Sequence, residues 1–282
     1  LTAIWGLGDI KSTADFNYVA SKSKVEKFVN TTIKQTVNLN ADVTVKEGAQ
    51  LDLSNFNGTF NGNGCTITVE KKDNNSNYVP LFNKIGVSAK IKDTNLLFNA
   101  EASVVYCSRT PLTENGCWGV FASNILAGGE MENCHVIRDV GFAFYNMNSY
   151  TKTTYNYFGA LVGYNEGTLI YGSTEKAANI RITIGAVSGD TSSSKMNNNY
   201  IVGGVVGKNG GTIVFNENGY TVKSTVQTGG ADFNYIRVGG VAGEMIRQTA
   251  RIEFNAPKNG TIYTAYKNTG NAADCRLTRG NL

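Results

Sequence analysis

The stretch YIVGGVVGKNGGTIVF, residues 200–215, places five glycines and one lysine around short runs of apolar residues. Two interpretations compete for it: a loop that binds phosphate, or a place where the backbone of a repeating fold turns or packs closely. A Walker A loop requires glycine at the position of Val202 and serine or threonine at the position of Asn209. The glycine spacing of dinucleotide-binding loops also fails to match. The glycines are therefore predicted to be structural, and no cofactor is expected.

The same pattern recurs along the chain. Similar segments begin at Gly159 (GALVGYNEGTLIYG), Gly203 (GGVVGKNGGTIVFN) and Gly239 (GGVAGEMIRQTARIEF), and looser copies begin at Gly119 and Val79. In chain order the five starts are separated by 40, 40, 44 and 36 residues. Tyrosine and glutamate stand at the position of Lys208 in the copies that begin at Gly159 and Gly239, so the lysine is not part of the repeated motif. A quasi-constant period of this length indicates a repeat architecture.

A second mark accompanies the repeat. An Asn-Tyr pair precedes four of the copies, and Trp118 precedes the remaining one. The tyrosines of these pairs are expected to hold each preceding loop against the body of the fold; they are Tyr78, Tyr157, Tyr200 and Tyr235.

Short β-branched segments such as TIVF (212–215) and IRITI (180–184) are bounded by turn residues, which is typical of strands. Helical spacing is sustained only near residues 12–20, where Ser12 or Thr13 is a candidate N-cap and Phe16, Val19 and Ala20 share one face. Two all-β architectures suit a 40-residue repeat: a propeller blade, or two coils of a right-handed parallel β-helix of roughly 20 residues each. The β-helix is favoured because the first 70 residues are β-rich without the repeat.

The expected organisation is a single β-helix domain spanning residues 1–282. Residues 1–35 form an N-terminal cap that contains the short helix, residues 36–255 form the coils, and residues 256–282 form the C-terminal end. Leu161, Val205 and Val241 should point inward, and the amides at 165 and 209 should form a ladder between neighbouring coils.

Composition excludes several functional classes. The net charge of +4 is spread along the chain without a basic stripe, so nucleic acid is not an expected partner. No apolar run approaches the roughly 20 residues of a membrane-spanning helix. For the five cysteines two interpretations are open: a disulfide between Cys107 and Cys117, or buried free thiols, which are favoured. No metal site is expected.

The single histidine, His135, lies near Glu130 and Glu132 in the sequence, which makes this segment the best candidate for acid–base or metal chemistry. However, an alternating strand would turn Cys134 and Val136 inward and place His135 on the outer face. No catalytic residue is therefore assigned.

The run FNGTFNGNGCTITVE (56–70), followed downstream by GALVGYNEGTLIYGS, resembles bacterial surface proteins built from GLUG repeats. Gly159, Leu161, Val162 and Gly163 match the motif, while the copies at Gly203–Gly207 and Gly239–Gly243 have valine in place of leucine. The resemblance covers roughly residues 50–255 and implies a right-handed parallel β-helix on a secreted or surface-anchored, often adhesin-like protein. It implies no catalytic residues. The glycines expected to form the turns of the repeat are Gly159, Gly163, Gly203, Gly207, Gly239 and Gly243.

A tyrosine-rich insertion, FYNMNSYTKTTYNYF (144–158), is the candidate contact surface for a glycan or a surface protein, because flat rings provide contact area at low entropic cost. The first hypothesis is thus a non-enzymatic, adhesin-like module at the bacterial cell surface or outside it, monomeric or part of a longer chain. A polysaccharide lyase or glycoside hydrolase and a passive spacer are the alternatives. The candidate ligand-binding residues are Trp118, Tyr145, Tyr150, Tyr155 and Tyr157.

Overall fold

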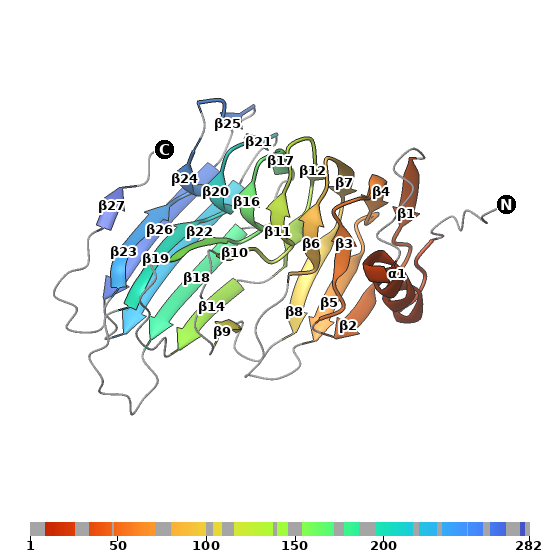
Figure 1. Cartoon of the computed structure of the whole chain (residues 1–282), viewed down its shortest axis with the longest axis horizontal. Helices are drawn as coiled ribbons and strands as arrows, with labels where there is room; N and C mark the ends of the chain where they lie inside the picture. Colours follow the sequence, from red (N-terminus) through yellow and green to blue (C-terminus); the bar gives the residue numbers. More distant parts are fainter. Residues whose placement is uncertain are drawn as a thin grey trace.

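The computed structural model describes most of the chain. The described residues are 9–25, 34–46, 48–70, 80–99, 104–108, 116–137, 140–145, 154–171, 178–185, 196–216, 220–229, 233–246, 248–255, 260–268 and 277–279. They form one helix and five parallel sheets that run along the long axis of the molecule, with the N-terminal elements at one end and the C-terminal strands at the other (Figure 1). The expected all-β class is confirmed.

Sheets 1 to 3 begin at the N-terminal end. Sheet 1 contains β1 (Gln35–Asn38), β4 (Asn57–Asn61), β7 (Ser88–Lys92), β12 (Glu130–Glu132), β17 (Thr168–Tyr171), β21 (Thr212–Phe215) and β25 (Arg251–Phe254). Sheet 2 contains β2 (Val43–Lys46), β5 (Thr66–Glu70), β8 (Asn95–Asn99) and β13 (His135–Val136). Sheet 3 contains β3 (Leu51–Leu53), β6 (Phe82–Ile85), β11 (Ala122–Ile125), β16 (Val162–Asn165), β20 (Val206–Asn209) and β24 (Ala242–Met245).

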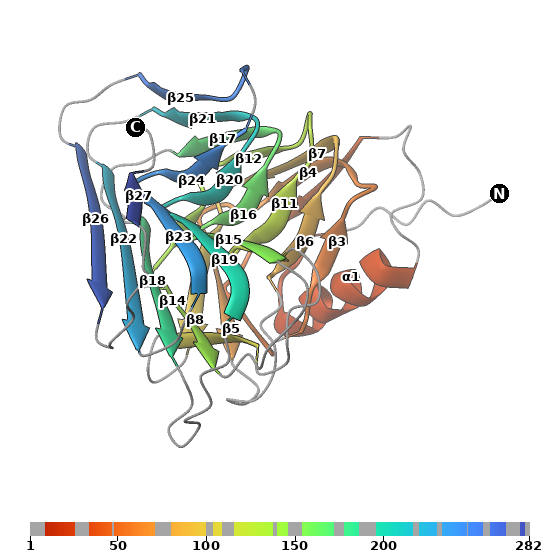
Figure 2. The ribbon, with the colours of Figure 1, turned by 60° about the vertical axis from the view of Figure 1, so that its left-hand side comes forward.

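Sheets 4 and 5 begin further along the chain. Sheet 4 contains β9 (Val104–Ser108), β14 (Val140–Tyr145), β18 (Ala178–Gly185), β22 (Tyr220–Gly229) and β26 (Gly260–Asn268). Sheet 5 contains β10 (Gly116–Trp118), β15 (Thr154–Gly159), β19 (Met196–Gly203), β23 (Phe233–Gly239) and β27 (Leu277–Arg279). From β14 onward the chain passes through sheets 4, 5, 3 and 1 in a recurring order (Figure 2).

The strand register shows how many residues separate two positions that pair with each other. Val43 pairs with Ile67, 24 residues later, whereas Val162 pairs with Val206, 44 residues later. The 40-residue repeat therefore corresponds to one passage through four sheets, and the expectation of two coils of 20 residues is wrong. The propeller alternative is also wrong, because the pairings within the described strands are parallel and join successive repeats instead of neighbours within one blade.

The predicted N-terminal helix is confirmed and extends further, as α1 (Thr13–Val25). Ser12 caps it: the Ser12 hydroxyl accepts a hydrogen bond from the Asp15 amide at 3.2 Å and donates one to the Asp15 carboxylate at 2.9 Å. Hydrogen bonds from the Lys11 amide, and next from Ser12, lower the pKa of Asp15. The predicted face is buried, since Phe16, Val19 and Ala20 belong to the core.

Helix α1 covers the edges of sheets 2 and 3 at the N-terminal end. The Thr44 amide donates to the Thr13 hydroxyl at 3.1 Å, and the Asp52 amide donates to the buried Ser23 hydroxyl at 3.1 Å. These bonds satisfy backbone donors of β2 and β3 that would otherwise be exposed at the sheet edge.

The core is a continuous column of apolar side chains. Leu161, Val205 and Val241 are buried, as predicted. The rings of Trp118, Phe158 and Tyr200 stack from repeat to repeat, with centroid separations of 6.2 and 6.3 Å. Each repeat thus buries apolar area on the repeat before it, which is the main source of stability in a fold with few local contacts.

A polar ladder lies within this core. Asn165 donates from its amide nitrogen to the side-chain oxygen of Asn209 at 2.8 Å, as predicted, and Asn209 donates to Met245 Sδ at 3.4 Å. Both asparagines are fully buried, so these hydrogen bonds offset part of the cost of removing two amides from water, while Asn165 Oδ1 has no partner among the described residues.

The repeated glycines lie in strands and not in turns, and none of them has positive φ. These glycines allow the backbones of sheets 3 and 5 to approach each other closely. A Cβ on Gly207 would lie 2.6 Å from the carbonyl carbon of Tyr157, and a Cβ on Gly163 would lie 2.5 Å from that of Cys117. The second glycine of each motif therefore packs on the backbone of a sheet 5 strand one repeat earlier, where any side chain would force the sheets apart.

We expect Gly207→Ala to lower the free energy of unfolding by about 2 kcal/mol or more, because the added methyl group overlaps backbone atoms that cannot move independently. Gly64→Ala is the matched control: its Cβ would meet no atom within 4 Å, so only its φ of 76° opposes the change, at about 1 kcal/mol. Urea unfolding of both variants measures the difference. Equal destabilisation would contradict the packing role of Gly207.

Candidate functional site

The most distinctive side-chain constellation in the described residues lies where sheets 3 and 5 meet. Lys208 on β20 places its ammonium 4.6 Å from the ring centroid of Tyr157 on β15 and 5.3 Å from that of Tyr164 on β16. Lys208 Nζ also donates to the Tyr157 hydroxyl at 3.3 Å. We call Tyr157, Tyr164 and Lys208 the tyrosine–lysine cluster.

Strand register explains why these residues meet. Tyr164 and Lys208 are direct partners across β16 and β20, so their side chains leave the sheet next to each other. Tyr157 belongs to sheet 5, whose backbone lies against Gly207 one position before Lys208. The absence of a side chain at Gly207 thus brings the lysine within reach of the Tyr157 ring.

Two carboxylates lie near the cluster, but neither forms an ion pair with Lys208. Glu244 is the cross-strand partner of Lys208 but pairs with Arg237, at 3.5 Å between Glu244 Oε1 and Arg237 Nη1. Glu166 accepts a hydrogen bond from the Tyr164 hydroxyl at 2.8 Å. In the part of the chain that the structure describes, the ion pairs do not include Lys208.

Cys117 on β10 lies close to the same cations. Burial raises the pKa of this thiol to about 11, and the positive charges of Lys208 and Lys84 act in the opposite direction. The thiol is therefore neutral at physiological pH and adds no negative charge to the cluster. Cys65, Cys117 and Cys134 are free thiols, so the Cys107–Cys117 disulfide is not formed. The side chain of Cys107 and the whole of Cys275 lie outside the described residues.

The predicted contact residues divide into groups. Tyr155 and Tyr157 lie two apart on β15 and share a face, but Tyr155 is 38% exposed whereas Tyr157 is only 8% exposed. Trp118 is partly buried and packs against the core. Tyr150 and the side chain of Tyr145 lie outside the described residues.

The Asn-Tyr pairs do not keep register with the glycines. Asn156 pairs with Tyr200, and Asn199 pairs with Tyr235, so the pair shifts by one position at each repeat. Tyr157 and Tyr200 therefore occupy different columns, although both are buried. Tyr200 lies in the core stack, and Tyr157 contacts Lys208. The side chain of Tyr235 and the whole of Tyr78 lie outside the described residues.

The sequence pattern singles out Lys208 only as a mismatch to phosphate-binding loops and gives no link between Lys208 and Tyr157. A signal was present: Tyr164, Lys208 and Glu244 each follow directly after the second glycine in the three close copies of the motif, and they differ from one another. Where repeats stack on one another, positions that vary between repeats and lie next to a repeated glycine indicate side chains that are free to form a binding surface.

The Glu130–Glu132–His135 segment is not one site. Lys90 on β7 forms ion pairs with Glu130, at 2.7 Å, and with Glu132. Partial burial acts to lower the pKa of Lys90, but the hydrogen bonds to Glu130 and Glu132 raise it overall. The carboxylates are thus neutralised on the outer face of sheet 1.

His135 is only 4% exposed, so its predicted position on the outer face is wrong. The chain bends at Asn133, whose φ is 49°, and this bend interrupts the alternation on which the prediction relied. His135 bonds to Asn133 Oδ1 at 2.7 Å and packs edge-on against Tyr171 at 5.7 Å, while Cys134 and Val136 are also buried.

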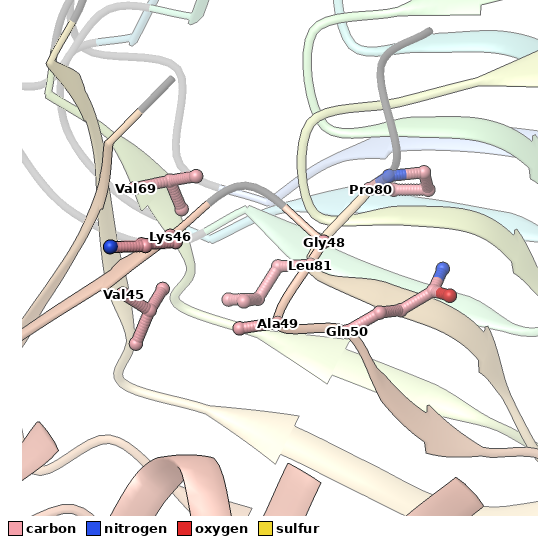
Figure 3. A pocket seen from close by; sticks show the side chains of 8 residues that line it. All are labelled: Val45, Lys46, Gly48, Ala49, Gln50, Val69, Pro80 and Leu81. Carbon is pink, nitrogen blue, oxygen red and sulfur yellow. The ribbon is translucent and has the colours of Figure 1, made fainter. Parts of the chain in front are cut away.

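A small pocket lies near the N-terminal end, between the turn after β2 and the segment that leads into β6 (Figure 3). It is lined mainly by apolar side chains, with Val45, Val69 and Leu81 facing it and Lys46 at its margin. Its volume of about 10 Å³ would hold at most about one water molecule, so it is too small for an organic ligand.

Among the described residues there is no group of three or more His, Cys, Asp or Glu side chains positioned to hold a metal ion. The described part of the chain also contains no helix with the length and apolarity needed to cross a membrane. Comparison with known proteins finds no match among family models, curated proteins or solved structures.

The geometry around Cys117 can be tested without any ligand. We expect Lys208→Met to raise the pKa of Cys117 above its value of about 11, because a cation that stabilises the thiolate is removed. The pH dependence of alkylation at Cys117, followed by mass spectrometry of its peptide, measures this shift. Lys46→Met, which removes an exposed cation of sheet 2, should leave the value unchanged. A lower or identical pKa in Lys208→Met would contradict the arrangement.

Proposed function

We propose that the chain is a right-handed parallel β-helix. The parallel register between successive repeats, the recurring order of sheets 4, 5, 3 and 1, and the stacked rings of Trp118, Phe158 and Tyr200 support this proposal. Right-handedness is expected because connections between parallel strands of one sheet are right-handed in about 98% of cases.

We further propose that this fold acts as a non-enzymatic binding and display module on or outside a bacterial cell, similar in its repeats to adhesin-like GLUG proteins. The observation that carries the proposal is the tyrosine–lysine cluster with Tyr155 beside it. An exposed ring and a fixed ammonium on a rigid sheet are typical of recognition surfaces, since little order must be gained on binding. A glycan is the favoured ligand because it offers apolar ring faces for tyrosine and hydroxyl groups for polar side chains.

The two alternative functions, an enzyme and a passive spacer, predict different results in activity and binding assays. A lyase or hydrolase on the same scaffold would need acidic groups positioned for proton transfer. The neighbouring carboxylates Glu130 and Glu132 are instead held by Lys90. A passive spacer would bind no glycan at all. Incubation with polysaccharides, followed by assays for reducing ends and for unsaturated products, distinguishes the enzyme; glycan-array binding distinguishes the spacer.

We expect Tyr155→Ala to weaken binding by about fivefold for those glycans that the intact protein binds, because one aromatic contact is lost. Tyr18→Ala is the matched control, because Tyr18 is also an exposed tyrosine but lies on α1, away from sheets 3 and 5. The measurement is glycan-array signal at several protein concentrations. Equal binding by Tyr155→Ala and the intact protein would place the contact surface elsewhere.

A further inference from the structure

The ammonium of Lys208 is held in position more firmly than is usual for a lysine near the surface. Two rings flank it, at 4.6 and 5.3 Å, and the Tyr157 hydroxyl accepts one of its three hydrogens. A lysine normally loses about 2 kcal/mol of side-chain freedom when a ligand orders it. Because the protein has already restricted this side chain, less of that cost falls on binding.

The held cation forms no ion pair with a described acid. Glu244, its partner in the register, is paired with Arg237. Glu166 keeps its negative charge, but its carboxylate accepts a hydrogen bond from the Tyr164 hydroxyl and forms no ion pair with Lys208. Cys117, which lies close to Lys208, is a neutral thiol. Lys208 therefore presents a positive charge that the described side chains do not offset with an ion pair.

A second cation extends this charge along the same sheet. Lys84 on β6 is exposed and lies in the same column as Lys208, joined to it through the partners Asn124 and Tyr164. Three strand spacings separate Lys84 from Lys208, or roughly 14 Å. Two cations three strands apart in this column, with a tyrosine and an amide between them, match an extended ligand that carries repeated negative charges.

We infer that the column Lys84–Asn124–Tyr164–Lys208 binds acidic polysaccharide, with the carboxylates of the sugar chain paired to the two lysines and a sugar ring against Tyr164. This inference rests on the proposed glycan-binding function and specifies its ligand class. Lys208 is the principal charge-selecting residue because its position is fixed, and exposed Lys84 contributes less. Binding should weaken as salt is raised from about 0.05 to about 0.5 M, because the contacts are ionic.

The test compares alginate, a carboxylated polysaccharide, with alginate whose carboxyl groups have been reduced to alcohols. Affinity electrophoresis in gels that contain either polymer gives the dissociation constants. Lys208→Met should weaken binding to alginate by about tenfold, and Lys84→Met by about threefold. Lys208→Arg should retain most of the affinity. Lys46→Met removes an exposed charge elsewhere and should have no effect. Circular dichroism verifies that each variant is folded.

Each contrary outcome has a distinct meaning. Equal retention by alginate and its reduced form, together with no effect of Lys208→Met, would overturn the acidic ligand and leave glycan binding intact. No retention by any polysaccharide, from a folded protein, would overturn both proposals. An equal loss in Lys46→Met and Lys208→Met, or equal affinity for single-stranded DNA, would show general attraction to polyanions and overturn the assignment of this column.

Discussion

The fold depends on one close contact: the backbone of sheet 3 lies directly on the backbone of sheet 5. Gly163 and Gly207 permit this approach, because a Cβ at either position would lie closer than van der Waals contact to the backbone of a strand one repeat earlier. The contact fixes the sharp path between β15 and β16 and between β19 and β20. It also sets where the side chains on either side of the glycines emerge, so the repeated motif positions the variable residues that follow it.

This constraint separates the repeated scaffold from the side chains that vary between its repeats. The residues after the second glycine, Tyr164, Lys208 and Glu244, stand in one column and differ in charge and shape. Their backbone positions are dictated by the glycines, whereas their identities are not. A ligand surface can therefore change along such a protein without disturbing its core, and the pairing of Lys208 with the Tyr157 ring is a product of the packing and not of a local sequence motif.

Much of the scaffold could be predicted from sequence. The buried face of α1, the inward Leu161 and the Asn165–Asn209 ladder followed from local periodicity and from the alignment of the repeats. The number of strands per repeat could not, because coil length depends on pairing between segments up to 44 residues apart. The predicted position of His135 was wrong because a bend at Asn133 interrupts the alternation of inward and outward side chains. The cluster was missed because its members come from different repeats and different sheets.

The central claim is that equivalent strands stack one after another along an axis, at a constant spacing, whatever the number of residues between them. Thr36, Thr168, Thr212 and Arg251 occupy one column of sheet 1. Spin labels at residue 36 and at each of the other three positions, measured by double electron–electron resonance, test it. The account predicts distances of roughly 19, 24 and 29 Å, which increase by one strand spacing at each step. Distances that do not increase in this order, or that follow a ring around a centre, would contradict it.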